Sequence, residues 1–103
     1  MSARFIVLYG IPHDVEEFER HYRQVHVPLA RALPGLRRYT LGRDVRMVRG
    51  DGPYHLVAEL EWDDMAALQA AFASPEGRAA AADMAAVTTL ADVRSMIYEA
   101  TNA

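Results

Sequence analysis

Proton transfer near neutral pH is the chemistry for which this sequence offers the most candidates, because it contains four histidines. His13 lies in a polar loop, and His21 is flanked by Arg20 and Arg23, so both are expected to face water. His21 and His26 are five residues apart, which is about 140° of rotation on an α-helix. We therefore do not expect these two side chains to bind one metal ion from the same face.

His26 differs from the other histidines because it lies one turn after Tyr22 on an apolar helical stripe, two residues before Pro28. Pro28 cannot donate a hydrogen bond to the carbonyl of Gln24, so the helix should be distorted there. An imidazole beside a broken turn can act as a proton shuttle or a ligand donor. It can equally be a core histidine bonded to backbone.

Tyr39 is the second candidate catalytic residue. It follows the helix stop at Pro34-Gly35 and begins the next strand, so it could lie near His26 and orient a carbonyl or phenolate with its hydroxyl. A structural role in core packing is an equally good explanation for Tyr39. Because small-molecule pockets are mostly apolar and aromatic, further residues are expected to bind a substrate: Tyr9, Phe18, Tyr22, His55 and Phe72.

Several other chemistries lack the residues that they need. The chain has no cysteine, no glycine-rich phosphate loop, no serine nucleophile motif and no carboxylates at metal-ligand spacing. We expect no metal and no cofactor. The arginines between residues 37 and 49 are interrupted by acidic residues in a chain of net charge −3, so they predict a solvated hairpin and no nucleic-acid partner.

Hydrophobic periodicity predicts the elements that must position these residues. Alternation at period two indicates strands and recurrence at three or four residues indicates helices. Strands are predicted at 5–9, 36–48, 54–62 and 93–98, and helices at 14–33, 65–73 and 75–86. Asp14, Asp63 or Asp64, and Ser74 are the expected helix caps. In the 54–62 strand, His55, Glu59 and Glu61 share one parity, which leaves pocket and solvent as open alternatives for them.

The predicted order, βαββαβ, is typical of the ferredoxin-like α+β fold, with a four-stranded antiparallel sheet and helices on one face. The other face would leave Val57 and further apolar residues uncovered. A second copy of the chain is the simplest cover, so we expect a homodimer with two sheets packed face to face.

Composition places the chain among packed globular proteins. Its 103 residues, 51% of them hydrophobic and 24% charged, predict one domain over residues 1–103. No segment has the pattern of a signal peptide or the ~20 apolar residues of a membrane span. The expected location is the cytoplasm, with no membrane partner.

The chain resembles the EthD family, which is named for a protein linked to ethyl tert-butyl ether degradation. The resemblance rests on the stretches 9–14, 26–30 and 33–39, including His-Val-Pro-Leu and Leu-Pro-Gly-Leu, and on Phe72 and Ser74-Pro75-Glu76. It implies a dimeric α+β barrel with a pocket between sheet and helices. Members that resemble lactone isomerases use a histidine and a tyrosine at the positions matching His26 and Tyr39.

Two classes of function follow from these residues. The first is a cofactor-free enzyme of isomerase, cyclase or decarboxylase type that acts on a small cyclic or aromatic metabolite, with His26 as base or acid and Tyr39 as orienting hydrogen-bond donor. The second is a non-catalytic carrier or accessory protein of a catabolic oxygenase system. Similar barrels also include cofactor-independent monooxygenases, and haem binding through His26 is a further alternative.

Overall fold

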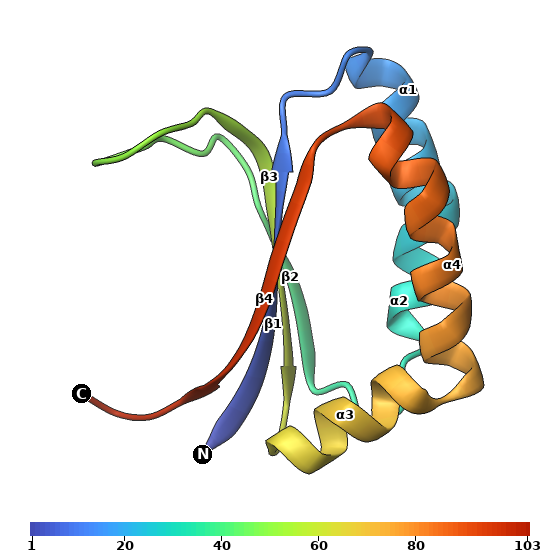
Figure 1. Cartoon of the computed structure of the whole chain (residues 1–103), viewed down its shortest axis with the longest axis vertical. Coiled ribbons are helices and arrows are strands. Elements are labelled where there is room, and N and C mark those ends of the chain that lie inside the picture. Colours follow the sequence, from blue (N-terminus) through green and yellow to red (C-terminus); the bar gives the residue numbers. More distant parts are fainter.

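The computed structural model describes all 103 residues and confirms the ferredoxin-like order of elements (Figure 1). Four antiparallel strands form one sheet in the order β2-β3-β1-β4. Helices cover one face of this sheet, and α4 runs beside the first helical region. The elements are β1 (Ser2–Gly10), α1 (Val15–His21), the π-helical segment η1 (Tyr22–His26), α2 (Val27–Arg31), β2 (Arg38–Gly42), β3 (Tyr54–Trp62), α3 (Met65–Ala73), α4 (Pro75–Leu90) and β4 (Val93–Ala100).

The core lies between the sheet and the helices, on the face that the alternation in β3 predicts. Leu56, Ala58, Leu60 and Trp62 are buried, and each lies opposite a residue of β1 in the antiparallel register. The helices begin at the predicted caps, since Asp14, Asp64 and Ser74 each accept a hydrogen bond from a backbone N–H in the first turn. Local sequence thus defines which face of β3 is buried and where the helices begin.

The second strand is shorter than the sequence pattern predicts. The alternation suggests a strand over 36–48, but β2 ends at Gly42 and the chain continues irregularly to Tyr54. Asp44 has a φ of +53°, in the left-handed region that interrupts an extended strand. The segment 43–53 extends beyond the sheet on the side away from the helices (Figure 1) and carries Val48, whose side chain is fully exposed.

The predicted distortion before Pro28 is a π turn. The backbone N–H of Val27 donates to the carbonyl of Tyr22, five residues earlier. This wider turn shifts the phase of the buried stripe. Tyr22, His26 and Ala30 face the core, whereas the apolar side chain of Val25 is 39% exposed.

The face of the sheet opposite the helices carries both charged and apolar side chains. Arg4 pairs with Glu59 at 2.8 Å and with Glu61 at 3.0 Å. By strand register, Ile6 and Met96 lie opposite each other on this same face. No other element of the chain covers this face (Figure 1). None of the helices combines the length and the hydropathy that crossing a membrane would need.

Candidate functional site

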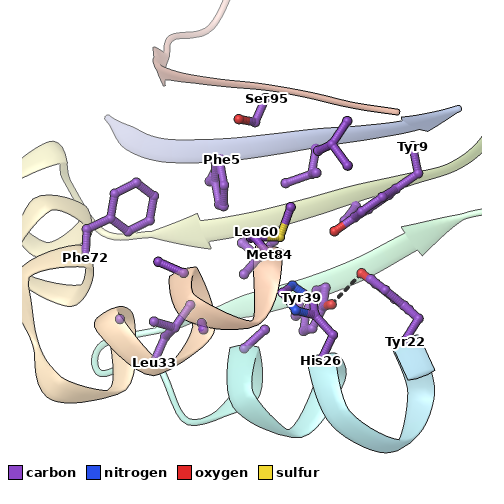
Figure 2. A pocket seen from close by; sticks show the side chains of 17 residues that line it. Phe5, Tyr9, Tyr22, His26, Leu33, Tyr39, Leu60, Phe72, Met84 and Ser95 are labelled. Atoms are coloured by element: carbon purple, nitrogen blue, oxygen red, sulfur yellow. Dashed lines mark hydrogen bonds between the residues drawn. The ribbon is translucent and has the colours of Figure 1, made fainter. Parts of the chain in front are cut away.

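A cavity of about 230 Å³ lies between the sheet and the helices (Figure 2). Its wall is mostly apolar and draws on β1, η1, α2, β2, β3, α3, α4 and β4. The lining residues that carry a polar side-chain group are Tyr9, Tyr22, His26, Tyr39 and Ser95. An apolar cavity with a few convergent polar groups is the usual form of a small-molecule site.

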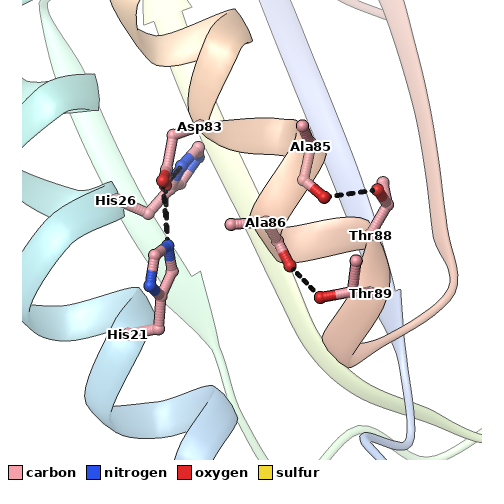
Figure 3. Close-up of polar contacts among 7 residues, drawn as sticks. All are labelled: His21, His26, Asp83, Ala85, Ala86, Thr88 and Thr89. Carbon is pink, nitrogen blue, oxygen red and sulfur yellow. Dashed lines mark hydrogen bonds and ion pairs between the residues drawn. The ribbon is translucent and has the colours of Figure 1, made fainter.

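His26 is the one imidazole in this cavity wall, and it is held in place by Asp83 of α4. Its residue is only 7% exposed, and its Nδ1 lies 2.9 Å from Oδ2 of Asp83 (Figure 3). An ionised carboxylate only accepts hydrogen bonds, so Nδ1 of His26 carries the proton. The lone pair of neutral His26 is then on Nε2, the ring nitrogen left for a ligand in the cavity.

His21 binds the same carboxylate from the other side, which corrects two expectations. Its Nε2 lies 2.9 Å from Oδ1 and 3.1 Å from Oδ2 of Asp83, so His21 is not a freely solvated side chain (Figure 3). The 140° separation from His26 assumed an α-helix. Because hydrogen bonds in a π-helix join residues five apart, its wider turn at Tyr22–His26 brings residues at this spacing towards the same side.

Three phenols form the polar part of the cavity near His26. The hydroxyls of Tyr22 and Tyr39 are 2.6 Å apart, and the ring centroid of Tyr22 lies 5.4 Å from that of His26 and 5.2 Å from that of Tyr9. Burial raises the pKa of Tyr9, Tyr22 and Tyr39 above the usual value of about 10. All three therefore stay protonated near neutral pH and are able to donate hydrogen bonds.

The sequence-predicted site residues separate into two groups. Tyr9, Tyr22, His26, Tyr39 and Phe72 line the cavity. The other two, Phe18 and His55, do not. Phe18 is fully buried among the rings of Tyr9, Tyr22 and His55, so it supports the wall from behind.

His55 is turned away from the cavity because it pairs with Glu19 of α1. Its Nε2 lies 2.7 Å from Oε2 of Glu19, which also accepts a hydrogen bond of 3.1 Å from Arg43. Burial acts to raise the pKa of Glu19, but the hydrogen bonds from His55 and Arg43 outweigh it, so this pKa lies below its ordinary value. This cluster joins α1 to the start of β3 and to the segment that follows β2.

Asp83 is the residue of this site that sequence reasoning missed. Its place in an alanine-rich helix suggested no role, although it is the only charged residue between Arg78 and Asp92. Its side chain is 10% exposed. A single carboxylate on a helix that is otherwise apolar over several turns was the available signal, since buried carboxylates are almost always paired.

These features define a ferredoxin-like α+β domain with an internal apolar pocket, in which a carboxylate fixes one imidazole. The chain belongs to the EthD family: the EthD domain model matches residues 12–90. An uncharacterised 11.0 kDa protein from the thcB-thcC intergenic region of Rhodococcus erythropolis is 35% identical over 82 residues, which are 80% of each chain.

Solved structures confirm the fold. An EthD family protein from Bacillus halodurans matches with a TM-score of 0.85 and 34% identity, over 98% of this chain and all of that one. SnoaB, a cofactor-independent oxygenase from Streptomyces nogalater, matches with a TM-score of 0.68 and 22% identity, over 99% and 95% of the two chains. A dimeric ferredoxin-like protein of unknown function from Thermobifida fusca matches with a TM-score of 0.59 and 26% identity, over 95% of this chain and 90% of that one.

Proposed function

We propose that this EthD family protein is a cofactor-free acid–base enzyme for a small cyclic or aromatic metabolite. The observation that carries the proposal is the buried His26, which lines the pocket while Asp83 holds its Nδ1 at 2.9 Å. A carboxylate in this position fixes the tautomer of the imidazole and stabilises the imidazolium that forms when Nε2 takes a proton.

In the proposed reaction, Nε2 of His26 removes a proton from the substrate and later returns it at a second position. The phenol of Tyr39, hydrogen-bonded to Tyr22, orients a substrate oxygen and stabilises the negative charge that develops on it. A positioned acid or base typically contributes 10²- to 10⁴-fold to the rate. This is sufficient for isomerisation, cyclisation or decarboxylation of an activated substrate.

A carrier role is the alternative, because the mostly apolar wall would serve a bound hydrophobic metabolite equally well. Such a carrier or accessory protein of an oxygenase system would need no acid–base group. The Asp83 partner of His26 favours the enzyme, since it prepares one ring nitrogen for proton transfer.

Measuring turnover distinguishes the enzyme from the carrier. Lactones and enolisable cyclic ketones are incubated with wild type, with His26→Ala and with His13→Ala, the last being a control at an exposed loop position. The enzyme predicts conversion by wild type and by the His13 variant but not by the His26 variant. Stoichiometric binding without conversion in any of the three would replace the enzyme with the carrier.

We also propose that the protein is a homodimer whose two sheets pack through their open faces. Apolar side chains including Ile6, Leu8, Val57 and Met96 lie on this face by register, and Met96 is 49% exposed. The similarity to a dimeric ferredoxin-like protein supports a dimer. Met96→Asp should place a buried charge in each half of the interface. Light scattering should then show a monomer, and a wild type that is already monomeric would contradict the proposal.

A further inference from the structure

The charges around the cavity restrict what the cavity can hold. None of the residues that line it is an arginine, an aspartate or a glutamate, and the chain contains no lysine. His26 is the one lining group able to become cationic, and its Nδ1 is already paired with the carboxylate of Asp83. Arg31 acts on the hydroxyl of Tyr39 only from outside the cavity wall. A ligand that enters as an anion would therefore be buried without a permanent cation in direct contact, which is strongly unfavourable.

The hydrogen-bonding groups of the cavity favour a ligand that is neutral when it arrives. Burial keeps the phenols of Tyr9, Tyr22 and Tyr39 protonated. One hydroxyl proton is used in the hydrogen bond between Tyr22 and Tyr39, so at most two of the three phenols can donate to a ligand oxygen. Nε2 of neutral His26 offers an acceptor in the same wall, because Nδ1 holds the proton that Asp83 accepts. An acceptor beside a phenol donor matches a ligand with an O–H group, or with a C–H group beside a carbonyl oxygen.

We propose that the site selects uncharged ligands with one acidic proton, namely phenols and enolisable ketones or lactones, and rejects carboxylates of the same shape. In the step that follows binding, the O–H or C–H bond of the ligand breaks and Nε2 of His26 takes the proton. The bonding electron pair stays on the ligand as a phenolate or enolate, whose oxygen accepts hydrogen bonds from the phenols. The two charges created, imidazolium and oxyanion, then neutralise each other inside the cavity.

This inference rests on the proposed function and narrows it. A decarboxylase must bind a carboxylate substrate, so a pocket that excludes carboxylates leaves isomerisation, cyclisation and other reactions that begin with an enolate or phenolate. The volume of about 230 Å³ limits the ligand to a small one, because it lies just below the range of roughly 300–1,000 Å³ of drug-sized pockets.

Calorimetric binding of matched ligand pairs near neutral pH tests the selectivity without requiring turnover. The pairs are 4-ethylphenol with 4-ethylbenzoate, and 2-naphthol with 2-naphthoate. We expect at least one phenol to bind, with an affinity at least about tenfold higher than that of its carboxylate partner. Equal or tighter binding of the carboxylate in either pair would overturn the proposal, and so would a folded protein that binds no phenol.

A chromophoric phenol separates this inference from the proposed function. 4-Nitrophenol is bound at a pH below that of its ionisation in water, and its phenolate absorption band is recorded with wild type, His26→Gln and the exposed control His13→Gln. The proposed function predicts the phenolate band with wild type and His13→Gln only. Preference for phenols over carboxylates without this band would support the ligand class while contradicting proton transfer to His26. Melting curves show whether each variant is folded.

Discussion

The molecule contains three histidine–carboxylate pairs, and two of them, His26–Asp83 and His55–Glu19, lie in contrasting surroundings. His26 and Asp83 are both only about 10% exposed at the side chain, and their neighbours in the cavity are phenols and apolar groups. His55 and Glu19 are both 20% exposed, and Glu19 also pairs with Arg43. The second pair is part of an ion cluster that joins secondary-structure elements, whereas the first leaves one ring nitrogen to a cavity. A histidine paired with a carboxylate thus lines a cavity in one place and joins secondary-structure elements in the other.

The largest difference between the two pairs should be seen in proton transfer. We expect His26→Gln to lower the rate of enolisation or the fraction of bound phenolate by 10²- to 10⁴-fold. His55→Gln should change either quantity by less than about twofold, since His55 does not line the cavity. The measurement is turnover or phenolate absorbance under identical conditions. Equal losses in both variants would remove the distinction between the two pairs.

Replacing Asp83 should lower activity more than replacing Glu19. Asp83→Asn replaces a carboxylate that only accepts hydrogen bonds by a neutral amide that can present either its oxygen or its NH2 group to Nδ1 of His26, so the tautomers mix and activity should fall by about 10- to 100-fold. Glu19→Gln should leave activity unchanged. Nitrogen NMR of the imidazole rings would follow the tautomer of His26 directly. An unchanged tautomer in Asp83→Asn would show that the carboxylate does not set it.

The phenols of the cavity predict a loss of stability in alkali. Below pH 10 they are protonated in both the folded and the unfolded chain. As the pH rises from about 10 towards the raised folded pKa, only the unfolded phenols ionise, and each lowers the unfolding free energy by up to about 1.4 kcal/mol per pH unit.

Denaturant titrations at several pH values measure this slope. Tyr9→Phe should make it shallower, whereas Tyr54→Phe, at a partly exposed position outside the cavity, should leave it as in wild type. A slope that is the same in all three proteins would mean that the buried phenols are accessible to solvent.

The smallest effect should come from the Glu19 cluster in acid. Because the pKa of Glu19 lies below its ordinary value in the folded chain, its contribution is present above the ordinary pKa and is lost as the pH falls through the folded one. Glu19→Gln should cost on the order of 1 kcal/mol at neutral pH. The difference from wild type should shrink below about pH 4, and a constant difference across the range would contradict the assignment.

Much of the fold follows from the sequence because periodicity and capping are local properties. The alternation in β3 identifies the buried face, and Asp14 and Ser74-Pro75 define where helices begin. The prediction of strand length was wrong at β2, because the alternation of apolar and polar residues continues past Asp44, where the backbone adopts a positive φ. Strand pairing, not alternation alone, decides where a strand ends.

The candidate site was predictable only in part. The spacing from Tyr22 identified His26 as a buried residue, and Pro28 indicated that the helix would be irregular there. The spacing could not predict that the irregularity is a π turn. An assumed α-helix therefore separated His21 from His26, although both reach one carboxylate.

The sequence by itself determined the order of the elements, the buried face of β3 and the place of His26 on the core side of its helix. These depend on residues within one or two turns of each other. Only the tertiary structure decided that Asp83, 57 residues further along the chain, is the partner of His26, and that His55 lies outside the cavity. Such contacts depend on how helices pack across the sheet, and a pattern that repeats every two to four residues carries no information about that distance.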